Sequence, residues 1–107
     1  RARFGLDSDL QIYHDGSNSY INEAGTGALV LQSAGPAIVL EKTNGENMSL
    51  ASTDGAVTLY YNGSAKIATT STGIDVTGNI GVTGTVETLP LQAQSRVGLL
   101  QVVVKYN

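Results

Sequence analysis

The stretch that decides the fold runs from residue 73 to residue 86 and reads Gly73-Ile74-Asp75-Val76-Thr77-Gly78-Asn79-Ile80-Gly81-Val82-Thr83-Gly84-Thr85-Val86. It is a six-residue unit written twice and begun a third time. Each unit places two β-branched residues two positions apart, so both side chains lie on the same face of an extended strand. Two small apolar side chains per unit cannot form a core within one chain. We therefore expect copies of the chain to wrap around a common axis, lined by Ile74, Val76, Ile80, Val82 and Val86.

The composition agrees with a core that is completed by other chains. The 107 residues include no Trp, one Phe, one Met and five Tyr, although 41% of them are apolar. A compact domain of this size buries roughly two-thirds of its unfolded surface, which calls for large side chains. The available Ala, Val, Ile and Leu residues make a core that is thin for a monomer and adequate for an oligomer.

Charge and cysteine content exclude several classes of function. The six basic residues are scattered along a chain of net charge −3, so no basic patch is present and we expect no nucleic-acid partner. Cysteine is absent, which removes disulfides, thiolate metal sites and thiol nucleophiles. The longest apolar run is far too short to span a bilayer, so we expect no membrane insertion. The chain starts at Arg1 rather than Met, and we expect it to be a fragment of a longer protein.

Regularly spaced turns predict an all-β architecture. Four Asx-Gly dipeptides, the strongest short-range hairpin signals, begin at Asp15, Asn44, Asp54 and Asn62. No window before residue 88 shows a sustained helical period with caps, so we expect no helix there. The β-prone runs that we predict to be strands are 10–13, 19–22, 28–31, 37–40, 48–51, 57–61 and 66–69.

An internal repeat organises the N-terminal part of the chain. The segment Leu10-Gln11-Ile12-Tyr13-His14-Asp15-Gly16-Ser17 aligns with Val57-Thr58-Leu59-Tyr60-Tyr61-Asn62-Gly63-Ser64. Alternation buries one face of each strand, and Asx-Gly supplies the turn residues with positive φ. We therefore interpret residues 1–70 as a β-hairpin module with repeat copies at 9–17 and 56–64.

Three shorter segments follow this module. Residues 71–87 hold the six-residue repeats and are expected to contact other chains. Residues 88–96 contain Pro90, which cannot donate to a strand ladder, and read as a linker. Residues 97–107 include the most apolar run of the protein and are expected to form a strand that opens, or docks against, a further module.

Three segments carry a resemblance to a known family: DLQIYHDGSNSYI (9–21), GAVTLYYNGSAKIATTSTGIDVTGNIGVTGTV (55–86) and GLLQVV (98–103). They resemble the repeated shaft modules of phage tail-fibre and related virion fibre proteins of the marine bacteriophage type. The resemblance implies an all-β, elongated homotrimeric fibre segment with β-hairpin modules. It also implies that the six-residue repeats form an intertwined stretch of the triple-stranded β-helix or spiral kind.

The same resemblance implies a structural function. The chain would be an extracellular spacer on a virion, serving host attachment without catalysis and without a cofactor. Its partners would be itself as a homotrimer, other virion fibre or tail proteins, and a host surface glycan. A subunit of an extracellular bacterial filament, built on the same β physics, is a more distant alternative.

Three local patterns resemble chemical sites, and each has a simpler explanation. His14-Asp15 is a histidine beside a carboxylate, but Asp15 belongs to a turn and Tyr61 fills the His14 position in the second repeat copy. Asp7 and Asp9 offer oxygen ligands to Ca²⁺ but lack the remaining ligands at loop spacing, so we interpret them as a solvated turn. The glycines from 78 to 81 are not followed by the Gly-Lys-Ser/Thr of a phosphate loop, and we assign them to close packing between chains.

Two rival functions remain open. The first is a carbohydrate- or receptor-binding module of a fibre tip, for which Tyr20, Tyr60 and Tyr61 are the candidate glycan contacts. Tyrosine in a hairpin more often covers a cross-strand neighbour, so the structural interpretation is favoured. The second rival is a tailspike-like depolymerase, which requires two carboxylates to converge in a groove between chains. Its candidates are Asp54, Asp75 and Glu87.

Overall fold

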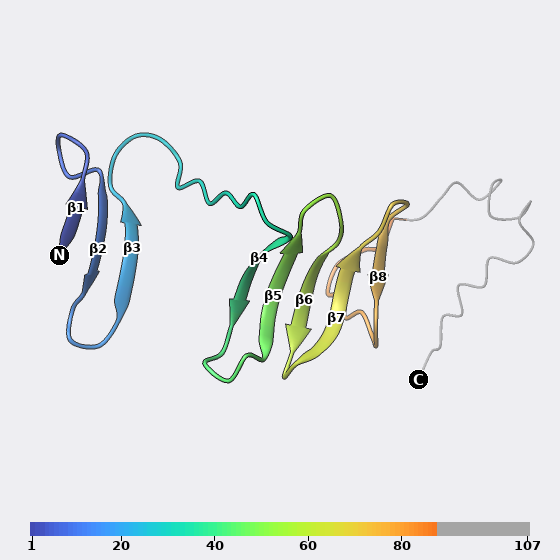
Figure 1. The fold of residues 1–107 in the computed structure, drawn as a ribbon. Helices are drawn as coiled ribbons and strands as arrows, with labels where there is room; N and C mark the ends of the chain where they lie inside the picture. Colours follow the sequence, from blue (N-terminus) through green and yellow to red (C-terminus); the bar gives the residue numbers. More distant parts are fainter. Residues whose placement is uncertain (88–107) are drawn as a thin grey trace, which may run out of the picture. The chain divides into compact units, whose positions relative to one another are not determined.

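A computed structural model describes residues 1–87, and these residues are all-β without a helix. They form two antiparallel sheets, one with three strands in the order β1-β2-β3 and one with five strands in the order β4-β5-β6-β7-β8 (Figure 1). Within each sheet every strand pairs with its neighbour in sequence, so both sheets are meanders. The expectation of an all-β chain is confirmed. The predicted linker at 88–96 and the predicted strand at 97–107 lie outside the described residues.

The three-stranded sheet contains the first copy of the internal repeat. Its strands are β1 (Ala2–Phe4), β2 (Leu10–His14) and β3 (Ser19–Glu23). Strand β2 forms a hairpin with β3, in which Ile12 lies opposite Ile21 and Tyr13 lies opposite Tyr20. The sequence did not predict β1, because three residues before a glycine are too few to show alternation.

The five-stranded sheet contains the second copy. Its strands are β4 (Ala37–Glu41), β5 (Asn47–Ser52), β6 (Val57–Tyr61), β7 (Ser64–Thr69) and β8 (Ile74–Val76). The first four of these match predicted runs to within a few residues. Strand β6 forms a hairpin with β7 around a two-residue turn, with a register shift between Leu59 and Tyr60.

All four Asx-Gly dipeptides lie in hairpin turns. Gly16, Gly45 and Gly63 have φ of 101°, 89° and 79°, the left-handed region that glycine enters without steric cost. The preceding Asn62 is also left-handed, with φ of 50°, as a two-residue turn with positive φ at both positions requires. In the fourth dipeptide the left-handed residue is Asp54, with φ of 57°, and not Gly55. The positive φ expected of the turn glycine is therefore confirmed in three of the four turns.

The predicted strand at 28–31 is wrong. Residues 24–36 contain no strand, and the side chains of Leu29, Val30 and Leu31 are exposed. The run is β-prone, but a strand exists only where a neighbour satisfies its backbone groups, and no described strand pairs with it.

The five-stranded sheet extends beyond residue 70. Thr70 N donates a hydrogen bond to the Gly73 carbonyl at 2.7 Å, and this turn brings β8 back alongside β7. Ile74 then lies opposite Thr69, and Val76 lies opposite Ile67. The first six-residue unit is thus part of the sheet, and the compact unit that contains it ends at Thr77 rather than at the predicted module boundary after residue 70.

No side chain among residues 1–87 is buried. Each sheet is a single layer that another element of the described chain does not cover. Large apolar side chains such as Phe4, Ile21, Leu40 and Leu59 are about half exposed. A sheet normally packs at least one face on a core, so the structure leaves this requirement unmet within the described residues.

Candidate functional site

The two faces of the five-stranded sheet differ in chemistry. Residues directly opposite one another in an antiparallel pair point to the same face. The strand register therefore defines rows of side chains that run across all five strands. One row consists of Leu40, Ser49, Leu59, Ile67 and Val76.

A second row lies on the same face and contains Ile38, Ala51, Val57, Thr69 and Ile74. We call these ten residues the apolar face. All of them except Ser49 and Thr69 are apolar, and none is charged. Even the Thr69 hydroxyl is engaged, since its Oγ1 accepts a hydrogen bond from Val57 N at 2.9 Å.

The opposite face, which we call the mixed face, has a different composition. Its central row contains Val39, Leu50, Thr58, Ala68 and Asp75. The Asp75 carboxylate thus lies at the β8 edge of the sheet and away from the apolar face. At the β4 edge the register shifts between Leu40 and Glu41, where Glu41 pairs with Asn47, so alternation assigns Glu41 to neither face.

The predicted axis residues fall into two groups. Ile74 and Val76 lie at one edge of the apolar face, beside Thr69 and Ile67. Ile80, Val82 and Val86 belong to the second unit, which begins at Gly78, and there they are exposed and outside any strand. The structure therefore joins the first unit of the repeat to a larger apolar surface that the sequence analysis did not identify.

Only one of the three glycines in the later repeats is required by the backbone of the described chain. Gly78 has φ of 106° and so requires glycine. Gly81 and Gly84 do not have positive φ, and a Cβ added to either would meet nothing within 4 Å. Neither backbone conformation nor crowding explains these two glycines, which leaves the assignment to close packing between chains as a prediction.

A ladder of aromatic and charged groups occupies one face of the three-stranded sheet. The rings of Tyr13 and Tyr20 stack with their centroids 4.8 Å apart and their planes at 19°. The guanidinium of Arg1 lies 3.8 Å from the Tyr13 ring centroid, a cation–π contact, and its Nη1 donates to Gln11 Oε1 at 3.0 Å. We call these four residues and Asp15 the tyrosine ladder.

Asp15 ties this ladder to the hairpin turn. Its Oδ1 accepts hydrogen bonds from the backbone N–H groups of Asn18 and Ser17, and its Oδ2 accepts one from the Tyr20 hydroxyl at 2.8 Å. These bonds, with that from Asn18 the strongest, hold the pKa of Asp15 below its usual value. The carboxylate is therefore a turn cap and an anchor for Tyr20.

The three candidate glycan contacts do not form one group. Tyr20 lies in the three-stranded sheet, whereas Tyr60 and Tyr61 lie in β6 of the five-stranded sheet. Tyr60 is half-buried opposite Ala65, and Tyr61 is 73% exposed opposite Ser64 at the hairpin end. Of the three, only Tyr20 stacks on another aromatic ring in the described chain.

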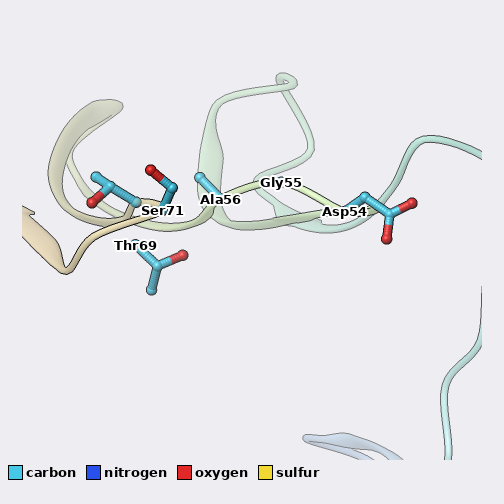
Figure 2. A pocket seen from close by; sticks show the side chains of 6 residues that line it. Asp54, Gly55, Ala56, Thr69 and Ser71 are labelled. Atoms are coloured by element: carbon cyan, nitrogen blue, oxygen red, sulfur yellow. The ribbon is translucent and has the colours of Figure 1, made fainter.

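A hollow of about 240 Å³ lies where two turns meet at one end of the five-stranded sheet. Figure 2 shows Asp54 and Gly55 from the β5–β6 turn at one side and Thr69 and Ser71 from the end of β7 and the following turn at the other. Asp54 is the one carboxylate among its lining residues. The hollow does not bring the candidates Asp54, Asp75 and Glu87 together.

The histidine beside a carboxylate, His14, has a structural partner. His14 Nδ1 lies 3.1 Å from Ser19 Oγ across the first hairpin. Among residues 1–87, no three His, Asp or Glu side chains gather at a spacing that could hold a metal ion. The described part of the chain also contains no helix long and apolar enough to cross a membrane.

Sequence reasoning missed two contributions. Arg1 joins the tyrosine ladder only because β1 pairs with β2, and β1 was not predicted. The part of the apolar face on β6 was visible as alternating apolar residues. The part on β4 belongs to a continuous apolar run that does not show which residues share a face, and the strand register that aligns the rows is not a local property of the sequence.

Comparison of the chain with protein-family models, with curated proteins and with solved structures finds no match.

Proposed function

We propose that the chain is a structural component of an extracellular virion fibre, in which copies of the chain assemble as a homotrimer. It acts as a β-rich spacer for host attachment and catalyses no reaction. Its partners are its own copies and the fibre or tail proteins that adjoin it.

The observation that carries this proposal is the absence of any buried side chain in residues 1–87. Two hydrogen-bonded sheets whose apolar residues remain exposed form a stable protein only if something covers those residues. An assembly of identical chains supplies the cover along the whole length of a fibre, since each chain contributes the same residues at the same level.

The meander topology also supports a mechanical role. Each strand pairs with its sequence neighbour, so the module folds from local contacts and can be repeated along a fibre. The resemblance to virion fibre shafts, which rests on residues 9–21, 55–86 and 98–103, supplies the biological setting of the proposal.

Electron microscopy of the purified chain, combined with its mass from light scattering, tests the proposal. We expect rods of uniform width with the mass of three chains. Compact particles with the mass of one chain would overturn it, because a monomer has no second chain to cover its sheets.

A second candidate function is carbohydrate or receptor binding by the tyrosine ladder. It is favoured by the combination of a stacked tyrosine pair, an arginine, an amide and an anchored carboxylate on one sheet face, which offers both a platform for a sugar ring and hydrogen-bonding groups. Binding of labelled host polysaccharide to the wild-type chain and to Tyr20→Ala tests this function. We expect Tyr20→Ala to lose binding and Tyr61→Ala, on the other sheet, to retain it. Equal binding by both variants would exclude the ladder as the site.

A further inference from the structure

We propose that the apolar face of the five-stranded sheet is the surface on which a second copy of this chain docks. The inference rests on the proposed function and specifies its interface. The proposed contact between copies is then not limited to the six-residue repeats. It includes a surface that begins at β4 and continues to Ile74 and Val76 on β8.

The apolar face is a continuous surface rather than scattered exposed residues. Its rows cross all five strands through direct cross-strand pairs, from Leu40 on β4 to Val76 on β8. At about 4.8 Å per strand and about 17 Å of strand length, its flat area is about 400 Å². This equals the largest apolar patch of a typical monomer, about 300–600 Å², and a patch of that size is often a functional contact surface.

The size of this face favours a second copy over the other sheet of the same chain. The three-stranded sheet also has an apolar side, formed by Ala2, Phe4, Leu10, Ile12 and Ile21. With three strands instead of five, its flat area is about 240 Å², so it cannot cover the larger face. In the proposed homotrimer this face of each copy turns toward the common axis, so it meets equivalent faces of the same width, length and chemistry.

The lack of charged groups on the apolar face also favours a second copy of the chain. Identical chains each carry a net charge of −3 and repel one another, so they associate most readily through a surface without charged groups. The ten residues of the apolar face include none, whereas Asp75 lies on the mixed face. A basic partner would gain nothing from a charge-free surface, and it would favour the mixed face instead.

Two valines provide a matched test of association. Val76 on the apolar face and Val39 on the mixed face are both 38% exposed, and they lie on the two edge strands of the same sheet. In an isolated chain, replacing either with Asn has the same small effect. If a copy covers the apolar face, Val76→Asn buries a polar group without a partner and weakens association on the order of 100-fold by sedimentation, while Val39→Asn does not.

Introduced thiols keep the proposal testable if the Asn variants fail to fold. The chain has no cysteine, so Ile67→Cys and Ala68→Cys each carry a single thiol. The two positions are adjacent in β7, and Ile67 lies on the apolar face whereas Ala68 lies on the mixed face. In the full chain we expect the Ile67→Cys thiol to react with a soluble maleimide at least tenfold more slowly than the Ala68→Cys thiol. We also expect this protection to disappear when the protein is diluted below its dissociation constant.

The outcomes separate the two proposals. A wild-type chain that remains a monomer would contradict the fibre function itself. An oligomer in which the two thiols react equally fast, or in which both valine variants associate equally well, would leave the fibre function standing and overturn the interface. Protection of Ile67→Cys that persists in a monomer would show that the chain covers its own face, which also overturns the interface.

Discussion

The two sheets of this protein share a repeated hairpin sequence but are held together in different ways. The three-stranded sheet is supported by side chains, because Arg1, Tyr13, Tyr20 and Asp15 form a connected ladder on one face. The five-stranded sheet has no comparable ladder among its described residues. It is held by its backbone ladder and by its turns, and it exposes an apolar face. A sheet that lacks side-chain support of its own depends most on a partner.

The two hairpin turns show the same difference at a smaller scale. In the first, the Asp15 carboxylate accepts two backbone N–H bonds within the turn and a third bond from Tyr20. In the second, Asn62 and Gly63 both adopt positive φ, and the two-residue turn closes the hairpin through its backbone conformation. The same sequence pattern thus forms a turn held by side-chain hydrogen bonds in one sheet and a turn held by its backbone conformation in the other.

The largest effect is expected from Leu59→Asn at the centre of the apolar face. If a copy covers this face, the substitution removes an aliphatic contact and leaves an amide without partners, at a cost of about 3 kcal/mol per chain to the assembled state. Thr58→Asn, on the mixed face of the same strand, should change stability by less than about 0.5 kcal/mol. Urea denaturation of the assembled protein measures both, and equal effects would contradict the difference between the faces.

Gly63→Ala should have the next largest effect, because this turn depends on its backbone conformation. Gly63 has φ of 79°, and a Cβ there would come within 3.1 Å of Glu46 Cγ. Left-handed backbone alone costs a residue with a Cβ about 1–2 kcal/mol. Gly27→Ala is the control, since Gly27 has open space and no positive φ. Denaturation midpoints should fall for the first variant and not for the second.

Asp15→Asn should alter the acid stability of the three-stranded sheet. The folded-state pKa of Asp15 lies below its unfolded value, so its ionised form stabilises the fold above the unfolded pKa of about 3.9. This contribution is lost as the pH falls through the lower folded-state pKa. The variant should therefore be less stable than wild type at neutral pH, with a difference that shrinks at low pH. A difference that is independent of pH would contradict the role of the carboxylate charge.

Tyr20→Phe should have the smallest effect. It removes the hydroxyl bond to Asp15 at 2.8 Å but keeps the ring that stacks on Tyr13. An exposed hydrogen bond of this kind contributes about 0.5 kcal/mol. Tyr61→Phe, with no hydroxyl bond among the described contacts, should have no measurable effect. NMR line shapes of Tyr13 in the Tyr20→Phe variant would show whether the stack survives.

The elements that the sequence predicts are those with a local cause. The strands around Ile12, Leu50 and Leu59 follow from alternation, and the turns at Gly16 and Gly63 follow from the need for positive φ. The run at 28–31 has the same local signal, yet it forms no strand because no neighbour pairs with it. Local preference predicts that a segment can be a strand, whereas pairing decides whether it is one.

The candidate surfaces were predictable only in part, for the same reason. Ile74 and Val76 were identified as packing residues from their spacing, but their neighbours Ile67 and Leu59 are brought beside them by the register of β6, β7 and β8. Tyr20 was identified by residue type, but its support from Asp15 and Tyr13 depends on the hairpin geometry. In both cases the chemistry of one residue was visible in the sequence and its surroundings were not.

The measurement that most directly tests whether copies complete the core is the dependence of thermal unfolding on protein concentration. A chain that folds only with its copies unfolds at a temperature that rises with concentration, because association stabilises the folded state by mass action. We predict a midpoint that increases steadily over a hundredfold range of concentration. A cooperative transition whose midpoint stays constant over that range would contradict the account, since it would show that one chain covers its own apolar faces.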